Sequence, residues 1–324
     1  MSIQSTLRCV VIALACAASS LAAAQTYPTK PIKIVVGFSP GGPADVMARL
    51  IGQRLTATLG QPVVVDNRPG AGGTIGARAV AESEPDGYTL LLGNTSTLVI
   101  SPQIYKNVGY DPVKAFAPVA AVFSSPQILV ANPVVPAKSM QELVAHAKAN
   151  PGKVSYASPG FGTQPHLLGE MLKLMTGADI VHVPYKGSAP VLADLIGGQV
   201  QIFFDAASFL LPHVVSGKLK VLAVADKKRL SQLPDTPTTI EAGFGKLQAT
   251  YWVGVLAPAG TPPAVVERLN GAINEVMKSK AMEETLAKLV ATARPGTPQD
   301  FASFMAAESR KWSETINAAN IRAD

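Results

Sequence analysis

Short apolar runs alternate with amphipathic runs along almost the whole chain, and this alternation restricts the possible fold more than any other feature. Most apolar runs end in a turn containing Gly or Pro, after which apolar residues recur at helical spacing. Strands that alternate with helices predict an α/β fold with largely parallel sheets. The expected strands lie at residues 32–38, 63–65, 88–92, 154–157, 180–183, 200–204, 220–225 and 252–257.

Two segments share one plan, in which a strand leads through a Ser-Pro-Gly turn into a helix with proline near its start. They read KIVVGFSPGGPADVMARL from Lys33 and KVSYASPGFGTQPHLLGEML from Lys153, 120 positions later. A helix N-terminus exposes unpaired N–H groups and the positive end of the helix dipole, so both turns suit an anion. The repetition favours two lobes with a cleft between them. Similar turns also join strands to helices in single-lobed proteins, so a single-lobed fold remains an alternative at this stage.

The first of these turns, GFSPGG, also matches the G-x-S-x-G pattern of a hydrolase nucleophile elbow. In that elbow the N–H after the serine stabilises the oxyanion, but Pro40 follows Ser39 and has no N–H. Gly41 and Gly42 instead let the backbone approach a ligand closely. Asp45, at the third helical position, is expected to cap local N–H groups. We therefore predict an anion-binding turn, and keep a periplasmic serine hydrolase at Ser39 as the less favoured alternative.

Other enzyme signatures are weak. RPGAGGTIGA, from Arg68, approaches a dinucleotide-binding pattern, but Ile75 replaces the third glycine, so a tight loop that leads into a helix is favoured. The histidines show no metal-binding spacing, and no pair of carboxylates is spaced for acid–base work. We predict no catalytic residue, no metal and no cofactor. The four histidines are His146, His166, His182 and His213.

Residues 1–24 resemble a cleaved signal peptide, with Arg8, an apolar core and three alanines before Gln25. They predict a periplasmic protein, and they contain both cysteines, Cys9 and Cys16. Whether Cys16 is a lipidation site stays open. Removal of the segment takes away Arg8 and changes the net charge from +6 to +5. The basic residues are dispersed rather than gathered in a stripe, which argues against nucleic-acid binding.

Four blocks in order closely resemble the Bug family, the periplasmic receptors of tripartite tricarboxylate transporters: YPTKPIKIVVGFSPGGPADVMARLIGQRL, GQPVVVDNRPGAGGTIGARAVAESEPDGYTLLLGN, HVPYKGSAPVLADLIGGQVQIFFD and LLPHVVSGKLKVLAVADKKR…LPDTPTTIEAGF. The resemblance runs from Tyr27 to the C-terminus. It implies a two-lobed type II periplasmic-binding-protein (Venus-flytrap) fold. Lobe 1 would comprise residues 25–125 and 226–324, and lobe 2 residues 126–225.

The resemblance also implies a function and a site. The protein would be a receptor that closes over a small carboxylate-bearing ligand, such as a dicarboxylate, aromatic acid or amino acid, and presents it to membrane subunits of a transporter. A monomer is expected, but the oligomeric state stays open. A sensor accessory that presents the ligand to a membrane signalling protein is the alternative, and the ligand's identity stays open. The expected binding residues are Phe38, Ser39, Pro40, Gly41 and Gly42 in the first turn, Ser158, Gly160, Thr163 and His166 in the second, Asn94 and Thr95 after one strand, and Asp205 after another.

Three further residues each have two possible roles. Phe161 either contacts an aromatic ligand or anchors its loop. Lys186, beside Tyr185, is either a ligand cation or a surface residue. Trp252 either reports on the cleft or belongs to the core.

Overall fold

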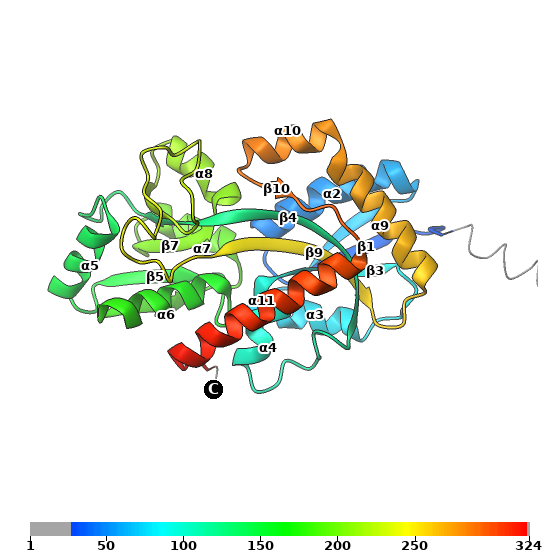
Figure 1. Ribbon diagram of the computed structural model, residues 1–324, viewed down its shortest axis with the longest axis horizontal. Coiled ribbons are helices and arrows are strands. Elements are labelled where there is room, and N and C mark those ends of the chain that lie inside the picture. Colours follow the sequence, from blue (N-terminus) through cyan, green and yellow to red (C-terminus); the bar gives the residue numbers. More distant parts are fainter. Residues whose placement is uncertain (1–26, 323–324) are drawn as a thin grey trace, which may run out of the picture.

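The computed structural model describes residues 27–322, which form a curled ten-stranded sheet with helices on both faces (Figure 1). The sheet order is β2-β1-β3-β9-β4-β7-β5-β6, with β8 and β10 paired to β4. The predicted α/β class is confirmed. The predicted signal peptide and Cys16 lie outside the described residues. None of the helices in residues 27–322 is both long enough and apolar enough to span a bilayer.

One half of the sheet contains three parallel strands, β1 (Ile32–Val36), β2 (Val63–Asn67) and β3 (Thr89–Asn94). β1 has the sequence IKIVV and is buried on both faces, as central parallel strands are. Helices α2 (Pro43–Leu59) and α9 (Pro263–Lys278) cover one face, and α3 (Thr74–Ala81) covers the other.

The other half contains the parallel strands β5 (Val154–Ser158), β6 (Ile180–Pro184) and β7 (Ile202–Ala206). β8 (Lys220–Val224) pairs antiparallel with β4. Two helices pack on each face of this half. One pair is α7 (Ser188–Ile196) and α8 (Ala207–Val215), and the other is α5 (Met140–Ala149) and α6 (Gln164–Thr176).

Two long antiparallel strands, β4 (Phe116–Ala131) and β9 (Thr250–Pro258), join the halves. β4 pairs with β9 as far as Pro126 and with β7 from Gln127 onward. These strands differ from the expectation of largely parallel sheets, because strands buried on both faces read alike in sequence whichever way they run. Figure 1 shows both strands crossing the middle of the molecule.

The segment 225–249 stays with the second half before β9 returns. Thr239 N donates to Val224 O at 2.8 Å, and Ala225 N donates to Gln127 O at 2.8 Å. Ala249 N then donates to Ala225 O at 2.9 Å. The return crossing of the chain therefore falls at the start of β9.

The remaining elements pack around the two long strands. η1 (Ala71–Gly73) precedes α3, as expected of a tight loop leading into a helix, while η2 (Ser96–Ile100) and α4 (Ser101–Ile104) follow β3. α10 (Lys280–Lys288) leads to β10 (Thr292–Ala293), which pairs with β4. α11 (Pro298–Ala319) begins with a capping box and runs beneath β4 (Figure 1). Trp252 is a core residue, 1% exposed, and its Nε1 donates to Glu308 of α11 at 3.0 Å.

Candidate ligand-binding cleft

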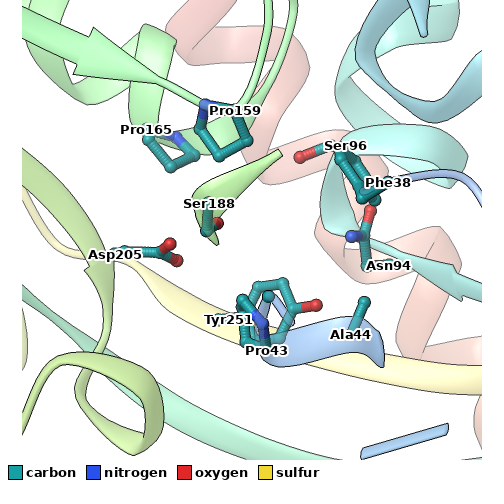
Figure 2. A pocket seen from close by; sticks show the side chains of 11 residues that line it. Phe38, Pro43, Ala44, Asn94, Ser96, Pro159, Pro165, Ser188, Asp205 and Tyr251 are labelled. Carbon is teal, nitrogen blue, oxygen red and sulfur yellow. The ribbon is translucent and has the colours of Figure 1, made fainter. Parts of the chain in front are cut away.

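A small cavity lies between the two halves, where the carboxyl ends of β1, β3 and β7 face one another (Figure 2). This is the crevice in which open α/β sheets bind ligands. Its volume, about 20 Å³, is close to what one water molecule needs. The first half contributes Phe38, Gly42, Pro43, Ala44, Asn94 and Ser96, the second half Pro159, Pro165, Ser188 and Asp205, and β9 contributes Tyr251.

The N-terminus of α2 forms one wall. Gly41 has φ +83°, which favours glycine, and Gly42 precedes the helix without any side-chain cap. Asp45 Oδ2 accepts the Gly41 N–H at 2.9 Å, and Arg49 pairs with the same carboxylate at 2.9 Å. Asp45 therefore caps locally, as expected. Burial works against its ionisation, but the bonds from Arg49 and Gly41 outweigh burial and lower its pKa.

The N-terminus of α7 forms the facing wall. Ser188 is its first residue and lies opposite Gly42, where an added Cβ would be 3.6 Å from the Ser188 Cβ. The turn before α7 also contacts the first turn directly. Ser39 N and Ser39 Oγ both donate to Lys186 O, at 3.1 and 2.9 Å. The side chain of Lys186 is exposed, and only its carbonyl takes part in this contact.

The Ser158–His166 loop contacts the cavity through its prolines, while its hydroxyl groups form hydrogen bonds within their own half of the molecule. Ser158 Oγ contacts Gly160 O at 2.9 Å and His182 Nε2 at 2.7 Å. Thr163 Oγ1 donates to Gly160 O at 2.6 Å. None of these residues lines the cavity, whereas Pro159 and Pro165 do.

Aromatic packing fixes this loop from behind. The His166 ring lies tilted between the rings of Phe161 and His182, with centroids 4.2 and 4.4 Å away. Burial, and to a smaller extent the neighbouring His182, lower the pKa of His166 to about 3. Phe161 contacts Tyr105 edge-on, and Phe161 O accepts the Tyr105 hydroxyl at 3.1 Å. Phe161 is therefore a loop anchor that joins the second half to the first.

Asn94 and Ser96 line the cavity from the first half, while Thr95 is fully buried behind them. Asn94 Oδ1 accepts the Thr97 N–H at 3.1 Å. Ser96 Oγ accepts the Gln164 N–H at 3.1 Å and so links the two halves. These side chains place an amide and a hydroxyl at the wall formed by η2.

Asp205 and Tyr251 supply the two most isolated polar groups of the cavity. Asp205 is 2% exposed, and its Oδ1 accepts the Ala206 N–H at 2.7 Å. Within residues 27–322, neither its Oδ2 nor the Tyr251 hydroxyl has a hydrogen-bond partner. Burial raises the pKa of Asp205 to about 7, although the nearby Ser188 hydroxyl and the Ala206 N–H oppose the rise.

Taken together, the cavity suits a small anion. The N-termini of α2 and α7 both lie at it without a side-chain cap, and helix N-termini carry unpaired N–H groups. Among residues 27–322, no Lys, Arg or His side chain lines it. Within residues 27–322, no group of three or more His, Cys, Asp or Glu side chains is placed to hold a metal ion.

The expected residues divide into three sets. Phe38, Gly42, Asn94 and Asp205 line the cavity. Ser39, Pro40 and Gly41 belong to the same turn as Gly42, next to Lys186 and Ala189. Thr95, Ser158, Gly160, Thr163 and His166 lie behind the walls.

Sequence reasoning missed seven lining residues: Pro43, Ala44, Ser96, Pro159, Pro165, Ser188 and Tyr251. Ser188 had a local signal, since Gly187-Ser188 follows a strand and begins a helix. Tyr251 had none, because β9 reaches the cavity only through its pairing with β4.

Known proteins extend this description. Residues 47–321 match the tripartite tricarboxylate transporter family receptor, TctC. Protein BugT of Bordetella pertussis is 41% identical over 316 residues, which cover 96% of this chain and 97% of BugT.

Two solved structures from Rhodopseudomonas palustris are also similar. Rpa4515 with adipate has a TM-score of 0.88 and 35% identity, covering 91% of this chain and 99% of that one. MatC with bound malate has a TM-score of 0.86 and 33% identity, covering 90% and 100%. The match to BugT covers nearly the whole length of both chains and confirms the resemblance to the Bug family. The match in sequence and in fold shows that the chain belongs to the TctC family of periplasmic solute-binding receptors.

Proposed function

We propose that this protein captures a small carboxylate-bearing ligand between two lobes and, as a monomer, presents it to the membrane subunits of a tripartite tricarboxylate transporter. Lobe 1 would comprise residues 25–125 and the C-terminal segment, and lobe 2 the residues from 126 onward. We place the return junction near 249 rather than 225, because the segment 225–249 bonds to β8 and β4.

One observation carries the proposal: the N-termini of α2 and α7 face each other across a cavity without a cationic side chain. Each helix end stabilises an anion by about 0.3–1 kcal/mol when exposed and up to about 2 kcal/mol when partly buried. Two ends and several direct hydrogen bonds, each worth about 1.5–3 kcal/mol to a charged group, are sufficient for micromolar affinity, about −8 kcal/mol. The adipate of the Rpa4515 structure and the malate of the MatC structure support a carboxylate as the ligand class.

Binding requires the lobes to separate and close again. A volume of about 20 Å³ leaves no room for a dicarboxylate, so the ligand enters an open form. Closure then brings Ser39 to Lys186 O and Ser96 to Gln164 N. A ligand shifts this equilibrium by its difference in affinity for the two forms.

Thermal unfolding and titration calorimetry test the proposal with adipate, malate, citrate, benzoate and glutamate. A ligand at 100 times its Kd adds about 2.7 kcal/mol to the free energy of unfolding, which raises Tm by several degrees. Gly42→Val adds bulk to the cavity wall beside Ser188 and should abolish the rise. Gly271→Ala, on α9 with no atom within 4 Å of the added Cβ, is the matched control. The absence of stabilisation by every carboxylate would refute the proposal.

Two alternatives have separate tests. For a serine hydrolase, Ser39 would need a base, but its Oγ donates to the Lys186 carbonyl. Ester turnover that disappears in Ser39→Ala would support this alternative. For a sensor accessory, deletion of the gene would abolish a transcriptional response to the ligand while uptake continues, whereas the transport proposal expects uptake to be lost.

A further inference from the structure

Asp205 places a carboxyl group where the proposed function brings another carboxylate. Figure 2 shows its oxygens directed toward the space beside Ser188, with Asn94 on the far side. One oxygen, Oδ1, accepts the Ala206 N–H, and the other, Oδ2, accepts no hydrogen bond from any described residue. An ionised Asp205 would present a second negative charge to a bound carboxylate, and two carboxylates cannot both stay ionised at contact distance in a buried site.

In the part of the chain that the structure describes, no cationic side chain lines the cavity beside Asp205. β9 presents the Tyr251 phenol, α7 the Ser188 hydroxyl and β3 the Asn94 amide. The adjacent β4 offers the apolar Ile128, which pairs with Asp205 in the sheet.

The helices that approach Asp205 are equally free of unpaired charge. α2 turns Pro43 and Ala44 toward the cavity, and its charged residues Asp45 and Arg49 pair with each other. α6 presents Pro165. α8 begins directly after Asp205 and carries Ser208, whose buried hydroxyl has no partner. This environment favours the neutral acid, which agrees with the raised pKa described above.

We propose that Asp205 is protonated in the liganded receptor and donates its O–H to a ligand carboxylate, so that each carboxylate is captured together with one proton from solvent. This inference rests on the proposed function and adds that ligand binding is coupled to the uptake of one proton. The Tyr251 hydroxyl, also without a partner among residues 27–322, points to the side of the cavity where Asn94 lies (Figure 2), so it could donate to the ligand from across the cavity. The ligand carboxylate would then receive N–H groups from the helix ends and O–H groups from these two side chains, and only the proton on Asp205 depends on pH.

Titration calorimetry with adipate tests the proton directly. At pH 8 the apparent enthalpy is measured in phosphate and in Tris, whose ionisation enthalpies differ, so that their comparison gives the number of protons taken up. We expect close to one proton per adipate at pH 8 and close to none at pH 5.5. The affinity should fall about tenfold per pH unit above pH 7.

Asp205→Asn replaces the O–H donor by an N–H donor that does not titrate. We expect this variant to give a measurable adipate isotherm with no proton uptake and no pH dependence between pH 6 and 9. Wild-type binding without proton uptake would overturn the inference and leave the proposed function standing. Binding of glutamate but not adipate, abolished in folded Asp205→Asn, would instead show an ionised Asp205 that accepts from a ligand ammonium, and would also overturn it. If no carboxylate binds to the wild type, both the function and the inference fall.

Discussion

The turn before α2 contacts the turn before α7 through Ser39 and Lys186, and Gly187→Ala tests whether this contact belongs to lobe closure. A Cβ at residue 187 would lie 2.9 Å from Ser39 N and 3.0 Å from Ser39 Cβ, whereas ordinary contacts begin at 3.4 Å. The turns must therefore separate by several tenths of an ångström. This separation lengthens both hydrogen bonds from Ser39 to Lys186 O.

The expected effect follows from those two bonds. Each neutral hydrogen bond contributes a net of about 0.5–1.5 kcal/mol, so the closed form loses about 1–3 kcal/mol relative to the open form. A ligand that needs the closed form then binds about 5- to 150-fold more weakly. Because the added methyl group touches the other lobe, the free energy of unfolding of lobe 2 itself should change little.

Small-angle X-ray scattering reports the closure, and calorimetry with adipate reports the affinity. We expect Gly187→Ala to be less compact with adipate than the wild type, and Gly271→Ala to match the wild type in both measurements. Gly187→Ala protein that is folded, equally compact and equally tight in adipate binding would show that the Ser39–Lys186 contact is not part of the closed state.

Three further predictions concern stability. Burial holds the pKa of His166 at about 3, below the 6.5 of an unfolded chain, so the stability it contributes is complete above pH 6.5 and lost as pH falls toward 3. Between pH 6.5 and pH 5 the free energy of unfolding should therefore fall by about 2 kcal/mol. In urea unfolding, His166→Gln should show a smaller fall over the same pH range, and an equal fall would contradict the role of His166. Gly73→Ala, with φ +92° and a Cβ 2.3 Å from Thr97 Cγ2, should lower the free energy of unfolding by about 3 kcal/mol or more, and an unchanged urea midpoint would contradict the clash. Trp252→Phe removes the bond to Glu308 and should cost about 1–3 kcal/mol in the same assay without changing adipate affinity; a changed affinity would place Trp252 in the cleft after all.

The fold was readable from the sequence because its strands and helices differ in local pattern. β1 and β5 are largely apolar runs that end in turns, and α2 begins at a Gly-Gly-Pro sequence. The roles of β4 and β9 were not readable, since the direction in which a buried strand pairs depends on residues far away in the chain.

The site was only partly predictable, for a similar reason. The β1–α2 turn has a local signature in Gly41 and Gly42, and it does line the cavity through Gly42. Ser158 and Thr163 have hydroxyls at a suitable turn, yet they bond to the backbone and side chains of their own lobe, a competition that composition does not reveal. Ser188 lines the cavity because α7 lies opposite α2, and this arrangement depends on the tertiary structure rather than on the local sequence.

The most direct measurement of the central claim follows backbone amides during ligand addition. In a ¹⁵N-labelled sample titrated with adipate, the amide resonances of Gly42, Ala44, Ser188 and Ala189 should move together and saturate at one stoichiometric equivalent, while those of α9 and α10 stay in place. Saturable binding that leaves the amides at the starts of α2 and α7 unmoved would contradict the account.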